Sequence, residues 1–130
     1  CTLEMLKYYN HLAECEKINT ERENVDWNDV YDFYGEMSDD VRKLNEPENV
    51  IDAVDEINLK QHWGDIVKII KSFPGYDECK QAMQKAGCKI TVDDIGKSRA
   101  LFDDCVKYSP YMRKRLTLFR LKDMIKVRDC

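Results

Sequence analysis

The chain has 130 residues, of which 43% are hydrophobic and 35% are charged, and its formal net charge is −4 at pH 7. This length suits a single domain over residues 1–130, and the hydrophobic fraction is too high for a disordered chain. Five glycines and three prolines are too few for the many turns of a sandwich or barrel, which favours an all-α fold. No apolar run is long enough to be a transmembrane segment.

Three helices are predicted in the first half of the chain. Apolar side chains recur at helical spacing from Thr2, so the first helix should run to about Lys17. Asp26 stands where the N-cap of a second helix belongs, and an aromatic stripe follows it to about Met37. Pro47 suits the first position of a third helix, because the N–H that proline lacks has no helical partner there.

The middle of the chain predicts two more helices with a turn between them. Residues 63–73 carry apolar side chains at helical spacing and are followed by a proline–glycine turn. Asp77 can cap a short helix that Gly87 would end. Residues 89–92 alternate like a strand, but the sequence offers no credible partner strand, so we expect a loop.

The last third predicts two helices on either side of a proline. The first should begin at Thr91 or Asp93 and pass through Cys105. The second should cover residues 111–128 and carries two apolar stripes, which is typical of a helix packed near the middle of a bundle. We therefore expect an all-α, compact bundle of six or seven short helices.

Six cysteines in a chain of this size are typical of disulfides in an oxidising compartment, and no zinc-site spacing is present. The predicted disulfide cysteines are Cys1, Cys15, Cys79, Cys88, Cys105 and Cys130. Cys79 and Cys88 cannot pair, because at ~1.5 Å per residue they would lie ~13 Å apart on one helix, beyond the ~7 Å that a disulfide spans. The same argument excludes Cys1 with Cys15 if the first helix is continuous. We therefore expect three disulfides between different helices, and with them secretion.

Charge is distributed unevenly along the chain. Residues 14–58 hold fifteen acidic and four basic residues, a net charge of −11, whereas residues 107–130 hold eight basic and two acidic residues, a net charge of +6. Either these segments neutralise each other, or the basic face binds an acidic protein, an anionic glycan or an anionic membrane, or the acidic face binds a basic ligand. Nucleic acid is disfavoured because the chain is acidic and lacks a nucleic-acid-binding motif. The candidate partner-binding residues are Arg113, Lys114, Arg115, Arg120 and Lys122.

No pattern in the sequence indicates an enzyme. Only His11 and His62 could shuttle protons at neutral pH, and neither has a partner suggested by spacing. Phosphate-binding loops, metalloprotease and hydrolase motifs and calcium loops are all missing. No catalytic residue, metal site or cofactor is therefore predicted.

The leading hypothesis is a secreted, monomeric, non-enzymatic protein that binds a macromolecular partner through a charged helical surface. A host-interaction, salivary or venom-like, or signalling role would suit it. The chain starts at Cys1 rather than Met, as expected after removal of a leader or in a shortened chain. The alternative is an extracellular carrier of a small hydrophobic or amine ligand in an aromatic-lined pocket. The pocket residues would be Tyr9, Trp27, Tyr31, Tyr34 and Trp63.

Overall fold

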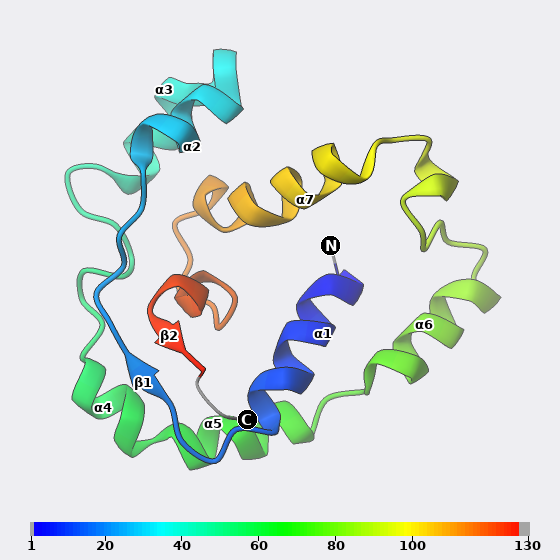
Figure 1. Ribbon diagram of the computed structural model, residues 1–130, viewed down its shortest axis with the longest axis horizontal. Coiled ribbons are helices and arrows are strands. Elements are labelled where there is room, and N and C mark those ends of the chain that lie inside the picture. The colour runs from blue at the N-terminus through cyan, green and yellow to red at the C-terminus, as the bar shows by residue number, and fades with distance from the viewer. Residues whose placement is uncertain (1, 128–130) are drawn as a thin grey trace.

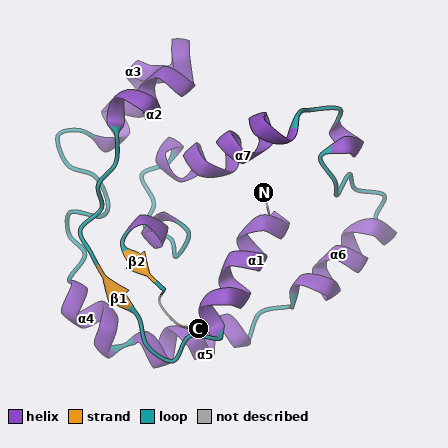
Figure 2. Cartoon of the chain, in the orientation of Figure 1, coloured by secondary structure: helices purple, strands orange, loops and turns teal. Residues whose placement is uncertain are grey.

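The computed structural model describes residues 2–127, and most of them lie in helices. The α-helices are α1 (Thr2–Ala13), α2 (Trp27–Tyr34), α3 (Ser38–Asn45), α4 (Glu56–Gln61), α5 (Trp63–Lys71), α6 (Tyr76–Lys85) and α7 (Arg99–Tyr108). The 3₁₀-helices are η1 (Gly35–Met37), η2 (Asp93–Ile95), η3 (Ser109–Met112) and η4 (Arg120–Asp123). Two short strands, β1 (Asn19–Thr20) and β2 (Ile125–Lys126), pair antiparallel (Figure 2). None of the described helices is long and apolar enough to cross a membrane.

The helices follow an open circuit rather than a compact bundle (Figure 1). Helix α1 lies inside the circuit and packs against α5 and α6, while α2 and α3 pack on each other and α3 also packs on η3. The chain exposes 8829 Å², whereas a compact protein of this mass exposes about 7,200 Å². The compactness expected from the sequence is therefore not reached.

Buried apolar side chains form two separate clusters. The first cluster consists of Leu12, Ile18, Ile51, Trp63, Ile70, Leu121, Met124 and Ile125. The second cluster consists of Val30, Tyr31, Val41 and Tyr111. Trp63 is fully buried in the first cluster, and its indole N–H donates to the carbonyl oxygen of Cys15 at 2.8 Å. The fold therefore rests on two small cores, one around α1 and α5 and one between α2, α3 and η3.

The segment 71–110 contributes no buried side chain to either cluster. Large apolar residues stay exposed in it, including Phe73 at 49%, Ile95 at 42% and Leu101 at 44%. We call this segment the outer arm. Its helix α6 contacts α1 and its helix α7 contacts η3, so the arm is attached to the cores at both of its ends.

Local signals explain where several helices begin and end. The Asp26 side chain accepts hydrogen bonds from the backbone N–H groups of Asn28 and Asp29, so its predicted role as N-cap of α2 is confirmed. Gly35 has a φ of 54°, which ends α2 and separates it from α3. Gly87 has a φ of 73° just beyond α6, as the predicted helix end requires.

The predicted third helix does not begin at Pro47. Residues 47–54 form turns, in which the Asn49 backbone N–H donates to the Asp52 carboxylate at 2.8 Å and the Ile51 N–H donates to the Asn49 side chain at 2.8 Å. These side-chain bonds satisfy backbone groups that a helix would otherwise pair. Helix α4 begins later, after its N-cap Asp55.

The prediction of one long helix over residues 111–128 is wrong in the part that the structure describes. Helix η3 ends at Met112, the backbone is extended at Arg113, and η4 and β2 follow. The apolar residues of this segment are divided between the clusters, with Tyr111 in the second and Leu121 in the first. Apolar spacing within a segment does not reveal that its side chains serve two different cores.

The predicted framework of three disulfides is also wrong. Cys79, Cys88 and Cys105 are free thiols, so the six cysteines of the chain can form one disulfide at most. All three lie on the outer arm, which lacks the tight packing that brings cysteine Cα atoms within ~7 Å of each other. Cys15 is buried and is not one of the free thiols, while Cys1 and Cys130 lie outside the described residues. The argument for secretion rested on the disulfides and loses its support with them.

Candidate binding surface

Three of the five basic residues predicted to meet a partner lie on an exposed loop between η3 and η4. We define the basic loop as Met112, the last residue of η3, together with residues 113–116. Arg113, Lys114 and Arg115 are exposed, and none of them pairs with a carboxylate of residues 2–127. Met112 and Leu116, at the two ends of the loop, are 39% and 56% exposed. The loop thus presents three unpaired cations between two apolar side chains.

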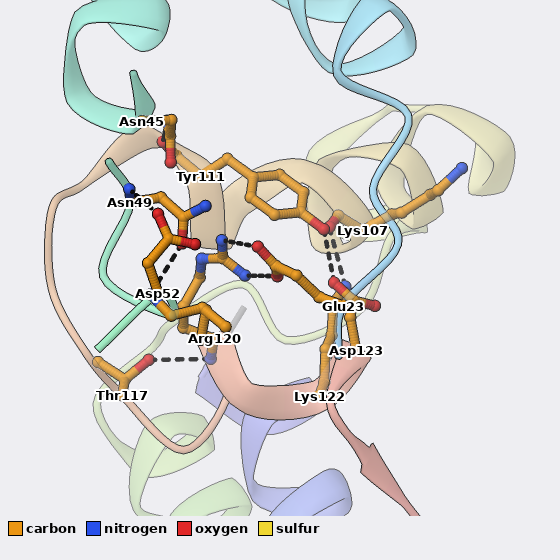
Figure 3. A network of polar contacts seen from close by, with 11 residues as sticks. Glu23, Asn45, Asn49, Asp52, Lys107, Tyr111, Thr117, Arg120, Lys122 and Asp123 are labelled. Atoms are coloured by element: carbon orange, nitrogen blue, oxygen red, sulfur yellow. Dashed lines mark hydrogen bonds and ion pairs between the residues drawn. The ribbon is translucent and has the colours of Figure 1, made fainter. Parts of the chain in front are cut away.

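Arg120, the fourth predicted residue, is buried inside the protein (Figure 3). Its side chain is 1% exposed and forms a bidentate ion pair with Glu23, with 2.9 Å between Nη2 and Oε1. The guanidinium carbon also lies 4.7 Å from the centre of the Tyr111 ring. Because both charges are withdrawn from water, each depends on the other for compensation. Arg120 therefore belongs to the interior of the fold and is too buried to contact a partner.

Lys122, the fifth predicted residue, is half-buried. Its ammonium group donates to the carbonyl oxygen of Lys107 at 2.8 Å, and burial lowers its pKa. Close by, the Tyr111 hydroxyl donates to the Asp123 carboxylate at 2.6 Å, and burial, followed by this carboxylate, raises the pKa of Tyr111. Figure 3 shows these contacts beside the buried ion pair. Together they hold in place the segment that carries the basic loop.

Exposed carboxylates lie on α2, η1 and α3, and α3 packs on η3. We define the acidic face as Asp29, Asp32, Glu36 and Asp39, which are exposed along α2, η1 and α3 and form no ion pair with any described residue. Asp29 and Asp32, three residues apart, suit one side of α2, while Glu36 and Asp39 follow on η1 and α3. Helix α3 packs on η3, from which the basic loop starts, and the Asn45 side-chain amide donates to the Tyr111 carbonyl oxygen at 2.8 Å. Packing therefore places surfaces of opposite charge on adjoining elements.

Among the described residues, one close ion pair joins the acidic segment 14–58 to the basic segment 107–130, between Glu23 and Arg120. The hydrogen bond with Tyr108 and, more weakly, the charge of Asp29 raise the pKa of Lys107. The basic residues of the acidic segment that form ion pairs bind carboxylates of their own segment, as Arg22 does with Glu56. The basic loop and the acidic face thus keep their charges. Internal cancellation, one of the three interpretations of the charge pattern, does not account for them.

The five aromatic residues considered for a ligand pocket are divided between the two clusters. Tyr9 and Trp63 pack in the first cluster, and Trp27, Tyr31 and Tyr34 pack in the second. Trp27 stacks on Tyr31 with 5.9 Å between ring centroids. These rings serve the interior of two separate cores.

The two histidines lie at the surface. His62 has its Nδ1 3.5 Å from an Asp65 carboxylate oxygen, and the two side chains are 63% and 67% exposed, so solvent screens the pair. His11 is exposed in the last turn of α1. Among residues 2–127, no group of three or more His, Cys, Asp and Glu side chains could hold a metal ion. That the chain is not an enzyme stays a prediction.

The chain matches no protein-family model, no curated protein and no solved structure. Its own geometry is therefore the basis for assigning a function. The sequence identifies the cations of the basic loop but places Met112 and Leu116 in helical apolar stripes, whereas both are exposed. The contact of α3 with η3 depends on tertiary packing and has no local signal in the sequence.

Proposed function

We propose that this chain is a non-enzymatic binding protein that recognises a protein partner through the basic loop and the acidic face together. The observation that carries the proposal is the presence of unpaired charges of opposite sign on adjoining, exposed elements. Complementary charges on a partner would speed encounter and set the orientation in which the two molecules meet.

A partner with charges of both signs suits this surface best. An anionic membrane or a glycosaminoglycan presents negative charge only, so it would attract the basic loop but repel the acidic face. This repulsion is felt within a screening distance of ~8 Å at physiological salt, and the net charge of −4 of the whole chain adds to it. A protein surface can place carboxylates opposite the loop and cations opposite the acidic face.

The apolar ends of the basic loop support the same conclusion. Met and Arg are enriched in protein interfaces, and the loop combines Met112 and Leu116 with two arginines. Full burial of one large apolar side chain contributes roughly 1.5–3 kcal/mol. Arg113 and Arg115 can each form bidentate bonds with a carboxylate. The loop therefore suits the centre of an interface that also includes the acidic face.

Quantitative affinity capture from an extract of the source organism tests the proposal. The loop variant changes Arg113→Gln, Lys114→Gln and Arg115→Gln. The acidic-face variant changes Asp32→Asn, Glu36→Gln and Asp39→Asn. The matched control for the loop changes three lysines that are exposed outside both surfaces, Lys60→Gln, Lys71→Gln and Lys85→Gln. The matched control for the acidic face changes Glu14→Gln, Glu16→Gln and Glu48→Gln, which are also exposed.

We expect the wild-type protein and both controls to retain one specific protein that each of the two variants loses. With that protein purified, each variant should raise the Kd by about tenfold or more, since every tenfold corresponds to about 1.4 kcal/mol. Vesicles of anionic phospholipid and immobilised heparin serve as the alternative probes. Equal capture by wild type and both variants, or binding to vesicles or heparin with no variant-sensitive protein, would contradict the proposal.

A further inference from the structure

A groove lies where α1, α6, the following loop and the start of α7 come together. Its volume is about 480 Å³. Figure 1 shows the N-terminal end of α1 between α6 and α7, on the side of the molecule where the outer arm turns back. The groove shares no residue with the basic loop or the acidic face. A ligand in this groove would therefore be recognised separately from the surface described above.

Cations from different elements converge on this groove. The ammonium nitrogens of Lys7 on α1 and Lys80 on α6 lie 5.5 Å and 5.8 Å from the centre of the same Tyr76 ring. The hydrogen bond with Glu4 raises the pKa of Lys7 overall. Arg99, in the first turn of α7, lies close enough for its charge to oppose this rise. Like charges that converge in this way repel one another, and an anion among them relieves the repulsion.

Two of the four cations that line the groove have no carboxylate partner. Lys80 and Lys89 form no ion pair within residues 2–127. The other two cations each bind a carboxylate of their own helix, Glu4 at 2.9 Å and Asp103 at 3.0 Å. The lining also holds the carboxylates of Glu4 and Asp93, so its four cations leave the groove with a formal charge of +2 on a chain that is negative overall.

The surface between these cations is apolar. Leu3, Met83, Ile90, Ile95 and Phe102 line it. Ile95 is 42% exposed, and Met83 and Phe102 are half-buried, so water reaches these side chains. A ligand that covers them gains the free energy of removing apolar surface from water.

We propose that the groove binds an acidic, amphipathic peptide segment of a protein partner. In this arrangement carboxylates of the peptide meet Lys80 and Lys89, and its apolar side chains lie on Met83, Ile95 and Phe102. The charge complementarity and the apolar surface both select this occupant. The site goes beyond the proposed function, because it binds through other residues and through a different combination of forces.

Other anions suit the groove less well. A fatty acid carries a single carboxylate, whereas the groove spreads its cations over α1, α6, the loop after α6 and α7. A polyphosphate or nucleic acid would meet the cations but leave the apolar side chains exposed. A peptide with several carboxylates and intervening apolar side chains matches both features.

A selection from short random peptides displayed on phage, carried out on the intact chain, tests this site. The groove variant is Lys80→Gln with Lys89→Gln. The matched control is Lys60→Gln with Lys85→Gln, which removes the same charge outside the groove, in part from the same helix α6. Thermal unfolding followed by circular dichroism confirms that each variant is folded. Selected peptides are then titrated in solution by fluorescence polarisation.

We expect the selected peptides to combine Asp or Glu with Leu, Ile or Phe and to bind saturably. The groove variant should raise their Kd by about tenfold or more, while the control variant and the loop variant bind them as wild type does. Unchanged binding by the loop variant separates this site from the proposed function. Failure to select acidic peptides, or equal affinity for the groove variant, would overturn the inference. Binding of dodecanoate without any selected peptide would also overturn it, since the groove would then be a fatty-acid site.

Discussion

Glu23 and Arg120, which stand 97 residues apart in the sequence, form a bidentate ion pair in which the arginine side chain is 1% exposed. Glu23 lies between β1 and α2, and Arg120 begins η4, so the pair joins segments from the first and the last quarter of the chain. Both residues belong to segments of strong opposite charge. In this pair the opposite charges meet in the interior of the protein, whereas the charges of the basic loop and the acidic face lie at the surface.

Arg120→Gln should lower the free energy of unfolding by about 3–5 kcal/mol, because it leaves the Glu23 carboxylate buried without its partner. Urea denaturation followed by tryptophan fluorescence measures this. The exposed neighbour provides the control, since Arg113→Gln should change stability by no more than about 0.5 kcal/mol. The double variant Glu23→Gln with Arg120→Met should lose less than the sum of its single variants. Equal stability of the Arg120 and Arg113 variants would show that the ion pair does not matter.

Stability should fall as the pH rises above about 10, where an unfolded tyrosine begins to lose its proton. Burial, followed by the hydrogen bond to Glu46, raises the pKa of Tyr31 to about 12. Between these two pKa values the folded chain therefore binds more protons than the unfolded chain. The contribution of the buried, neutral tyrosine to the free energy of unfolding is lost as the pH rises through this range. Ionisation of Tyr8 and Tyr111 should lower the stability in the same way, since burial raises the pKa of both.

Urea denaturation at about pH 9 and about pH 11 measures the alkaline loss. Tyr31→Phe should be less stable than wild type at neutral pH, because the hydrogen bond of 2.8 Å to Glu46 is lost. It should also show a smaller decline between the two pH values. A stability that stays constant across this range would contradict the assignment of buried, neutral tyrosines.

Cys79, Cys88 and Cys105 should all react with iodoacetamide in the folded, unreduced protein. Cys88 is exposed and should be modified first, followed by the half-buried Cys79 and Cys105. Peptide mass spectrometry locates the label, and a reduced, unfolded sample defines complete modification. If any of the three becomes reactive only after reduction, that cysteine is in a disulfide and the assignment of free thiols fails.

Backbone amides of the outer arm should exchange with deuterium sooner than those of α1 and α5. Helices α6 and α7 contain no buried side chain, whereas α1 buries Leu3 and Leu12 and α5 buries Trp63 and Ile70. Helices with few buried contacts open at low free-energy cost. Hydrogen exchange followed by mass spectrometry resolves the helices, and equal protection of α7 and α5 would refute the distinction.

Local features of this fold could be predicted from the sequence. Asp26 caps α2 because a carboxylate at that position meets the first free N–H groups of the helix whatever surrounds it. Pro47 satisfied the rule for a helix start equally well, yet the side chains of Asn49 and Asp52 bond to the backbone and hold turns instead. The sequence alone does not decide whether a helix forms or whether side-chain hydrogen bonds to the backbone replace it.

The candidate surface could be predicted only in part, because charge counts do not distinguish an exposed cation from a buried one. Arg113 and Arg120 look alike in the sequence, and only the distant Glu23 explains why one is exposed and the other buried. The disulfide prediction failed for a related reason. It assumed that Cys79 and Cys105 lie on tightly packed helices, whereas both lie on the outer arm.

Zero-length carbodiimide crosslinking of the captured complex, with the linked residues identified by mass spectrometry, shows which surfaces of the chain meet the partner. We expect Lys114 to join a carboxylate of the partner and Asp32, Glu36 or Asp39 to join lysines of that same partner. Crosslinks confined to residues outside both surfaces, or to one surface alone, would contradict the proposed function.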